Sequence, residues 1–402
     1  MKVLVVIHYP VFGGPHNQAL LLASSLSHYG VTTTVLVPGR TPDEEGSAYE
    51  RLRDAGVDVV AVDLGRARAT MDPRRHVSFL RQLPRDIRTI RTIVKDRGID
   101  VVQVSGLVNP HAALAARLEG VPVVWQLLDT RPPMAVRRAL FPLVVTLADV
   151  VMTTGRAVAE VHPGVAGLGE RLRIFFPPVD PEYFDPALVD RQEARQAYGF
   201  DPADVVLGTV GNLNPQKGHE YLIRAASMLR RTSPNVRVLL VGASHGTHRE
   251  YERDLRRLSD VLGLVVGRDV VFAGGLADVR PALAAMDVFV LGSVRRSEGA
   301  PTAIEEAMMM GVPVVATDVG AVLEVVENGT TGFVVVPEDS HALSTAIARI
   351  VENPGVRQDL GRRSRERALE LFTADECARV HVDAYRVALA RSNGPTPARR
   401  PA

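Results

Sequence analysis

The chain has little cysteine, little lysine and no long apolar run. Its single cysteine, Cys377, excludes an internal disulfide and fits a reducing compartment. The longest apolar stretch, near residues 139–152, is interrupted by Pro142 and Asp149, whereas a membrane-spanning helix needs about 18–20 apolar residues. Residues 1–7 hold a five-residue apolar run, which is too short for a secretory signal. We therefore expect a soluble protein of the cytoplasm.

Neither sign of charge dominates the sequence. Its 402 residues include 47 Lys or Arg and 46 Asp or Glu, for a net charge of +1. A dedicated nucleic-acid binder usually carries a basic excess, so we expect no nucleic-acid partner. A hydrophobic content of 46% and a charged content of 23% are ordinary for a globular protein and exclude bulk disorder. At roughly 100–200 residues per domain, the length suggests two or three domains.

Lysine is scarce among the basic residues. The only three lysines are Lys2, Lys95 and Lys217, and the other 44 basic residues are arginine. This ratio indicates a bias in the coding sequence and not a function. Lys217 nevertheless stands out, because it follows a strand-like run and a turn rich in glycine and proline.

Short apolar runs alternate with longer amphipathic segments in the first half of the chain. Continuously apolar runs are typical of strands that are buried on both faces of a parallel sheet. The runs expected to be strands are residues 3–7, 33–37, 57–62, 101–104, 121–127 and 150–153. Helical patterns such as 17–29 and 77–97 lie between them, so the predicted fold class is α/β with a doubly wound parallel sheet.

A proline-rich stretch, residues 176–201, separates these runs from a second series. The second series of expected strands comprises residues 205–210, 236–241, 270–273, 288–291, 312–316 and 332–336. We therefore predict two Rossmann-like domains, at residues 1–182 and 186–371, with a ligand cleft between them. A helix at 374–391 is expected to pack on the first domain, and residues 392–402 are expected to be disordered.

The most specific segment of the second half reads SEGAPTAIEEAMMMGVPVVAT. Pro301 is expected to be the first residue of a short helix. The next amides, of Thr302 and Ala303, lack intrahelical partners and lie at the positive end of the helix dipole, which suits a diphosphate. Glu298 precedes this helix and Glu306 lies about a turn and a half inside it, so both carboxylates can border one ligand. The alternative is a solvated turn acid and an acid on the helix surface.

This segment resembles the E-x7-E motif of retaining family 4 glycosyltransferases, which have the GT-B fold. That family shows an acid, a glycine, a variable residue and a proline, followed by EAM and then G-x-P-V-V-A. The matching residues here are Glu298, Gly299, Ala300, Pro301, Glu306, Ala307, Met308 and 311–316, and the match continues at 318–320, Glu324, 328–329 and 332–333. The resemblance implies that Glu298 holds hydroxyls of the transferred sugar and that Glu306 accepts the ribose hydroxyls of the nucleotide. It also implies that residues 299–303 border the donor.

A second element is the turn GNLNPQKG, residues 211–218, between a strand-like run and a helical pattern. A cation at the carboxyl end of a strand, beside a helix start, is placed to neutralise a diphosphate leaving group. The turn resembles the family's G-R-L-x-x-x-K-G, with Gly211 and Lys217 at family positions and Asn212 in place of the arginine. The resemblance implies that Lys217 binds the diphosphate and carries more of that task than usual. The alternative is a surface lysine in a turn.

A third element, YPVFGGPHNQ, follows the first expected strand. Its adjacent glycines, Gly13 and Gly14, permit positive φ angles and close approach of the backbone to a phosphate. The loop lies where the family has a Gly-Gly loop, which implies donor binding, with Gly14 as the more favoured contact. An ordinary turn is the alternative.

The fourth element departs from the family. Relatives commonly have a histidine before the aspartate in phrases like V-W-T-L-H-D, whereas this chain reads VVWQLLDT, with Leu128 at the histidine position and Asp129 retained. Retaining enzymes of this kind are thought to use the leaving phosphate as the base, so Leu128 is compatible with catalysis. His16 and His111 are expected in loops after strands, where either histidine can substitute on the acceptor side. A structural role for each histidine is the alternative.

Residues 66–97 contain ten Lys or Arg against three acids. The ordinary interpretation is an amphipathic covering helix at 77–97 with a solvated arginine face. The functional interpretation is a patch for an anionic acceptor, with Arg66 and Arg68 on the acceptor side, or for peripheral contact with a membrane surface.

Taken with the resemblance, these features predict a retaining, nucleotide-sugar-dependent glycosyltransferase. The expected reaction moves a hexose-type sugar, from a UDP-sugar in preference to a GDP-sugar, to a hydroxyl of a glycan, lipid-linked or small-molecule acceptor. Residues 1–182 would bind the acceptor and 186–371 the donor, with Glu298, Lys217, Asp129 and His111 as catalytic candidates. No cofactor or metal is expected beyond the substrate, because the sequence lacks an Asp-x-Asp pattern. The alternatives are a GT-B protein that binds nucleotide sugar without transfer, and a GT-B phosphorylase or epimerase.

Overall fold

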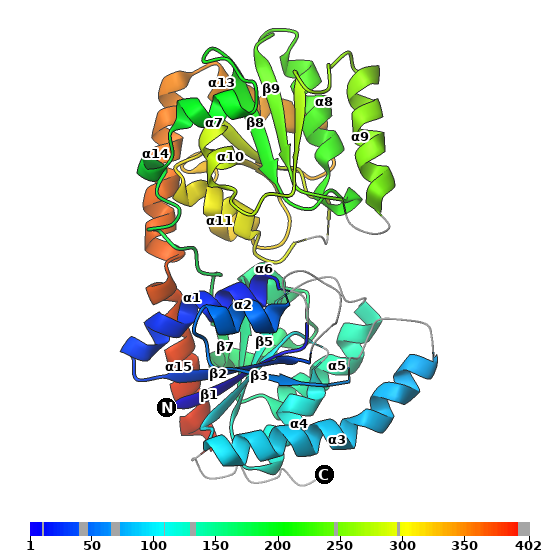
Figure 1. The fold of residues 1–402 in the computed structure, drawn as a ribbon, viewed down its shortest axis with the longest axis vertical. Helices are drawn as coiled ribbons and strands as arrows, with labels where there is room; N and C mark the ends of the chain where they lie inside the picture. The colour runs from blue at the N-terminus through cyan, green and yellow to red at the C-terminus, as the bar shows by residue number, and fades with distance from the viewer. Residues whose placement is uncertain are drawn as a thin grey trace. The chain divides into compact units, whose positions relative to one another are not determined.

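A computed structural model describes residues 1–9, 12–39, 47–65, 73–107, 109–128, 134–244, 248–295 and 298–392. The chain divides into two compact units. The first unit comprises Met1–Pro178 and Ala374–Ala402, and the second comprises Val179–Thr373. In each unit, helices cover both faces of one sheet (Figure 1).

The first unit contains a seven-stranded sheet in which every strand pairs in parallel with its neighbours. Its strands are β1 (Lys2–Ile7), β2 (Thr32–Pro38), β3 (Val59–Val62), β4 (Val101–Ser105), β5 (Val123–Leu127), β6 (Val150–Thr153) and β7 (Leu172–Ile174). The strand order is β3-β2-β1-β4-β5-β6-β7, so the winding direction reverses between β1 and β4. The sequence pattern missed β7, which has only three residues, all of them partly exposed.

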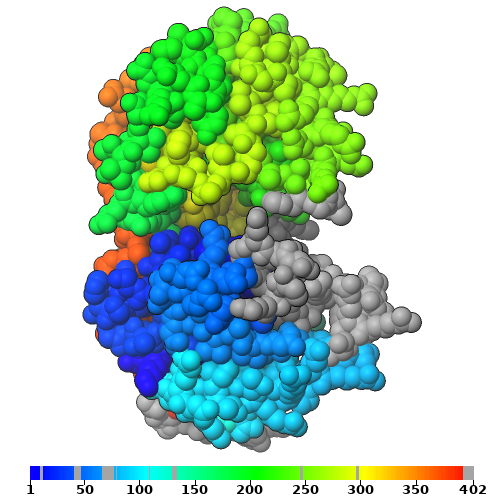
Figure 2. Space-filling model, in the orientation of Figure 1, coloured from blue at the N-terminus to red at the C-terminus, as the bar shows by residue number. Residues whose placement is uncertain are grey.

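Two apolar layers enclose this sheet. The helices of the unit are α1 (Gly14–His28), α2 (Ala48–Asp54), α3 (Pro73–Arg97), α4 (Pro110–Leu118), α5 (Met134–Leu147), α6 (Arg156–Glu160), the 3-10 segment η1 (Val165–Arg171) and α15 (Ala374–Ser392). One core joins α1, α2 and α15 to the sheet, and the other joins α3, α4 and α5 to its opposite face. Side chains of α1, α2 and α3 form much of the surface of this unit seen in Figure 2.

A buried polar network fastens α15 to the sheet and to α1. The imidazole of His381 uses Nδ1 to donate to the carbonyl of Cys377, at 2.7 Å. Its Nε2 therefore accepts from the side-chain amides of Gln18, at 2.9 Å, and Gln126, at 2.8 Å. Burial lowers the pKa of His381 to about 4, so the ring stays neutral at neutral pH. Tyr385, one turn further along α15, donates its hydroxyl to Gln103 at 2.5 Å.

The basic helix α3 is partly neutralised where it meets its neighbours. Ile90 and Val94 are buried against the sheet, as its amphipathic pattern predicts. Arg91 and Lys95 both pair with Glu119, at the end of α4. Within the described ranges, no helix combines the length and the apolar character that crossing a membrane requires.

The second unit is built on a six-stranded parallel sheet. Its strands are β8 (Val205–Val210), β9 (Val236–Val241), β10 (Val270–Gly274), β11 (Val288–Leu291), β12 (Val314–Thr317) and β13 (Gly332–Val335). The order is β10-β9-β8-β11-β12-β13, so here the winding reverses between β8 and β11.

Helices again lie on both faces of the second sheet. They are α7 (Arg191–Ala197), α8 (His219–Leu229), α9 (Arg249–Val261), α10 (Arg280–Ala285), α11 (Thr302–Met309), α12 (Val322–Val325), α13 (Ser340–Val351) and α14 (Pro354–Leu371), with 3-10 turns η2 (Pro186–Leu188) and η3 (Pro215–Lys217). Helices α8, α9, α13 and α14 share one core with the strands. Helix α11 packs against β11, β12 and α14.

Candidate active site

The candidate site of the second unit lies at the point where its sheet reverses direction. Strands β8 and β11 are neighbours there, and the chain leaves their carboxyl ends toward opposite sides of the sheet. In doubly wound sheets, ligands bind in the crevice outside such a switch point. The loop after β8 contains Lys217, and the loop after β11 contains Glu298.

The backbones of the loops after β8 and β11 lie in direct contact. Lys217 ends the 3-10 turn η3, whose start is capped by the side chain of Asn214, and Gly218 follows with a left-handed φ of 60°. A Cβ on Gly218 would lie only 2.0 Å from the carbonyl oxygen of Gly292, so any larger residue there would force the loops apart. The amide of Val294 also donates to the carbonyl of Gln216, at 3.0 Å.

Lys217 and Glu298 meet directly. The ammonium Nζ of Lys217 lies 2.7 Å from Glu298 Oε1, although 81 positions separate the residues in sequence. The Glu298 side chain is 7% exposed and the Lys217 side chain 22%. Ser293, which is fully buried, donates its hydroxyl to the same carboxylate oxygen at 2.6 Å. The sequence interpretation missed Ser293, whose one signal is its place just after β11.

A third loop supports the backbone of Glu298. Gly320, after β12, has a left-handed φ of 55°, and a Cβ there would lie 2.4 Å from the carbonyl oxygen of Gly299. The amide of Ala321 donates to that same carbonyl, at 3.0 Å. Thr317 donates its hydroxyl to the carbonyl of Ser293, at 2.6 Å. The glycine of the family-like segment 318–320 thus lets β12 hold the acid-bearing loop.

Helix α11 begins one residue later than the sequence predicts. Pro301 is the residue that precedes the helix, with φ −83° and ψ 91°, and Thr302 is the first helical residue. In the described part of the chain, the amides of Thr302 and Ala303 donate to no carbonyl or side chain, whereas the Ile304 amide donates to Pro301. Ala300, which leads into this turn, is partly buried. The two unused amides stay available to an anion.

The two adjacent acids of α11 lie in different surroundings. Glu306 is partly exposed, and burial raises its pKa to about 7. Glu305 is fully buried, and neither of its carboxylate oxygens has a hydrogen-bond partner in the described chain. Burial, aided by the nearby Glu306, raises the pKa of Glu305 well above its ordinary value. The sequence interpretation overlooked Glu305, because a second acid beside a motif acid looks like a surface residue.

The remaining donor-side candidates of the second unit flank β8. Gly211 donates its amide to Val241, at 2.9 Å, and a Cβ on Gly242 would lie 1.9 Å from the Gly211 carbonyl oxygen. Asn212, at the position of the family's arginine, is exposed. Within the described ranges, no group of three or more His, Cys, Asp or Glu side chains is arranged to hold a metal ion.

The glycine loop of the first unit is braced by a histidine. Neither Gly13 nor Gly14 has a left-handed φ, and a Cβ on either would meet open space. His16 lies in the first turn of α1 and not in a loop, so that expectation was wrong. Its Nδ1 accepts from the Gly13 amide, at 3.2 Å, and its Nε2 donates to the carbonyl of Tyr9, at 3.0 Å. Both ring nitrogens are therefore used within the loop, and burial lowers the pKa to about 4.

His111 also lies in a helix and not in a loop. It occupies the first turn of α4, after β4, and is 1% exposed. Neither ring nitrogen has a hydrogen-bond partner in the described chain, and burial lowers its pKa to about 4. Leu128, at the family's histidine position, packs against the apolar core of α1 and α15. The candidates Asp129, Arg66 and Arg68 lie outside the described residues.

Two family models together match most of the chain. Residues 190–367 match the model of glycosyl transferases group 1, and residues 13–180 match that of a glycosyl transferase 4-like domain. The chain belongs to the group 1 glycosyltransferases. The predicted family is thereby confirmed, and so is the GT-B fold of two Rossmann-like sheets.

Named relatives of this glycosyltransferase act on different sugars. An alpha-D-kanosaminyltransferase of Streptomyces kanamyceticus is 31% identical over 63% of this chain and 67% of its own length. A GDP-mannose-dependent alpha-(1-6)-phosphatidylinositol monomannoside mannosyltransferase of Mycolicibacterium smegmatis is 32% identical over 64% of this chain and 65% of its own. The chain spans about half the length of other curated relatives that it matches.

A solved structure shares the fold of the whole chain. The crystal structure of Anabaena HepE in complex with UDP is similar at a TM-score of 0.78, covering 96% of this chain and all of that one. The two sequences are 22% identical. At that level the likeness establishes the fold alone.

Proposed function

We propose that this chain transfers a hexose-type sugar from a nucleoside diphosphate sugar to an acceptor hydroxyl, with retention of anomeric configuration. The observation that carries the proposal is the ion pair between Lys217 and Glu298 at the switch point of the second sheet. Without donor, each residue neutralises the other. With donor, Lys217 would face the diphosphate and Glu298 the sugar hydroxyls, so both charges keep a partner throughout the cycle.

The groups around this pair complete a donor site. The amides of Thr302 and Ala303, at the start of α11, add positive partial charge for the diphosphate. Glu306, further along the same helix, would accept the ribose hydroxyls. This arrangement draws its positive charge from Lys217 and from amides, so the proposal requires no metal ion. The proposed donor remains a UDP-sugar in preference to a GDP-sugar, as expected from the sequence.

The proposed chemistry needs no histidine at the position of Leu128. The bond between the anomeric carbon and the diphosphate oxygen breaks, and the acceptor oxygen bonds to that carbon on the same face. The acceptor proton passes to an oxygen of the leaving phosphate. A protein base is therefore dispensable, and the leaving group is stabilised by the cation that Lys217 supplies.

A panel of nucleotide sugars tests the proposal. We expect UDP- or GDP-sugars to raise the melting temperature, because a ligand that binds only the folded state stabilises it by about 2.7 kcal/mol at a hundred times its Kd. The same nucleotide sugar should then be consumed, with an acceptor present, and the product's configuration read by NMR. If nucleotide sugars stabilise the chain but none of them is consumed, the protein binds nucleotide sugar without transferring it. Phosphate-dependent cleavage of a glycoside would indicate a phosphorylase, and no stabilisation by any nucleotide would remove the proposal.

Donor affinity should depend on pH through Glu306. An ionised carboxylate accepts from both ribose hydroxyls more strongly than a carboxylic acid, which spends one oxygen on its own O–H, so the ionised form should bind the donor more tightly. Since the pKa of Glu306 is about 7, donor affinity should fall as the pH drops below that value, by up to about tenfold per pH unit, and level off above it. Isothermal titration with a UDP- or GDP-sugar, whose diphosphate does not titrate near pH 7, would measure this slope. Glu306→Gln should bind weakly and flatten the profile, whereas a profile unchanged by that substitution would contradict the assignment.

A further inference from the structure

A hollow lies in the second unit, at the end of the sheet opposite the candidate active site. It has a volume of about 580 Å³ and is bordered by the starts of α7 and α14 and by the turns that precede β11 and β12. Much of its lining is apolar, with Met286, Met310 and Val312 among the side chains. Strand amino ends surround this hollow, whereas Lys217 and Glu298 follow strand carboxyl ends.

Three arginines converge on one carboxylate beside this hollow. Asp287 is 6% exposed, and its Oδ1 lies 2.8 Å from Arg191 Nη2 and 3.1 Å from Arg357 Nη1. Its Oδ2 lies 3.2 Å from Arg195 Nη1 and accepts from the amide of Val206, at 2.8 Å. Of the described residues that line the hollow, Asp287 is the one acid. One carboxylate among three guanidinium groups leaves two positive charges without an anion.

The arginines differ in how fully they are used. Arg191 donates through Nη1 to the carbonyls of Ala284 and Met286, both at 2.7 Å, and through Nη2 to Asp287. The Arg357 side chain is 27% exposed, and its ion pair with Asp287 is the one polar contact of that side chain in the described part of the chain. Its remaining N–H groups therefore stay available at the wall of the hollow. A guanidinium group that is held by one hydrogen bond can still offer a pair of parallel N–H donors to a phosphate or a carboxylate.

The start of α14 adds to this positive field. Arg357 lies in the first turn of this 18-residue helix, which carries no acidic residue there. The helix dipole therefore places partial positive charge at the same wall, next to Pro354 and Gln358. An anion in the hollow would meet this helix start together with the unused nitrogens of Arg357.

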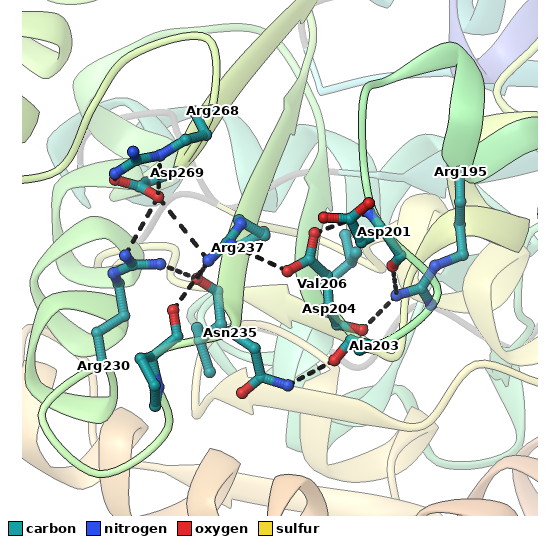
Figure 3. Close-up of polar contacts among 12 residues, drawn as sticks. Arg195, Asp201, Ala203, Asp204, Val206, Arg230, Asn235, Arg237, Arg268 and Asp269 are labelled. Carbon is teal, nitrogen blue, oxygen red and sulfur yellow. Dashed lines mark hydrogen bonds and ion pairs between the residues drawn. The ribbon is translucent and has the colours of Figure 1, made fainter.

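A second arginine cluster at the same end of the sheet shows what a purely structural arrangement looks like (Figure 3). There, Asp269 pairs with Arg230, Arg237 and Arg268. Arg230 and Arg237 also donate to backbone carbonyls, and Arg237 pairs with a second acid, Asp204. None of these residues lines the hollow. The cluster at Asp287 differs by having an open cavity and an arginine with spare donors.

We propose that this hollow is a binding site for a small phosphate-bearing molecule. Arg357 and the exposed face of Arg191 would hold the phosphate, with Asp287 fixing both guanidinium groups. An apolar part of the ligand would lie against Met286 and Met310. The site is separate from the donor site and does not depend on glycosyl transfer as the activity.

The test titrates the full chain with inorganic phosphate and with phenyl phosphate, at constant ionic strength set with chloride. We expect a saturable rise in melting temperature, with phenyl phosphate binding more tightly because its ring covers the apolar wall. Arg357→Met keeps the aliphatic stem and should weaken phosphate binding about tenfold or more, the equivalent of one charge-assisted hydrogen bond. Arg362→Met is the matched control, because Arg362 lies on the same helix and pairs with Asp359 and Glu366 at the surface.

Further arms separate this site from the donor site. Saturating UDP or the substitution Lys217→Ala should leave the phosphate response in place, whatever the activity of the chain. If Arg357→Met does not fold, Arg357→Lys can replace it, because lysine keeps the positive charge but lacks the paired guanidinium donors. Broadening of the 31P signal of phosphate by the unmodified chain gives an independent measurement of binding. An equal response in Arg357→Met and Arg362→Met would overturn the proposal. The proposal would also be overturned if Lys217→Ala abolished the rise in melting temperature caused by phosphate. It would be overturned as well if phosphate gave no saturable rise beyond that caused by chloride.

Discussion

Substitution of Lys217 by alanine is expected to lower the rate of glycosyl transfer by about 100- to 1,000-fold, the usual effect of removing one preorganised group that stabilises developing charge. Lys217 is one of three lysines in the chain and stands where the sheet reverses direction. Asn212, at the position of the family's arginine, offers no charge, so the loss has no nearby compensation. The measurement is initial rate at saturating donor, together with donor affinity.

The ion pair makes this substitution a test of stability as well. Lys217→Ala would leave the buried carboxylate of Glu298 with Ser293 as a remaining donor, which should lower the free energy of unfolding by about 1–3 kcal/mol. The double variant Lys217→Ala/Glu298→Gln should recover most of that stability and none of the activity. Lys95→Ala is the matched control, because Lys95 is an exposed lysine paired with Glu119 in the first unit. Near-normal transfer by Lys217→Ala would rule out its assigned role.

The sheets could be predicted closely because their strands are buried on both faces. The expected strands at 205–210, 236–241 and 288–291 coincide with β8, β9 and β11. Strand β7 could not be found, because a three-residue, partly exposed run has no apolar pattern. Pro301 was placed one residue too far into its helix, because the preference of proline for the first turn does not distinguish adjacent positions.

The site was predictable only where motif spacing matched a family. Lys217 and Glu298 were both named from the sequence, but their contact depends on β8 and β11 being neighbours, which no local pattern encodes. Ser293 carries no distinguishing signal, since its role comes from a tertiary hydrogen bond. His16 and His111 were expected in loops because the glycines and prolines beside them indicate turns, and both instead lie in the first turn of a helix.

Replacing Glu305 is expected to stabilise the folded chain above neutral pH. Burial raises its pKa in the fold well above the ordinary 4.5, so the folded chain keeps a proton that the unfolded chain releases. Between these two pKa values, the free energy of unfolding therefore falls by about 1.4 kcal/mol for each unit of rising pH. Glu305→Leu removes this titration and the unpartnered carboxyl, and should gain about 2 kcal/mol or more at pH 8.

The buried histidines allow the Glu305 effect to be isolated. Burial lowers the pKa of His16, His111 and His381 to about 4, so these groups add stability as pH rises toward 6.5, opposite in sign to Glu305. The difference between the unmodified chain and Glu305→Leu cancels their contribution, and urea unfolding from pH 5 to 9 would measure it. Glu250→Gln, which alters an acid on the exposed face of α9, should leave the profile unchanged. A difference that does not grow with pH would mean that the Glu305 carboxyl finds a partner in solution.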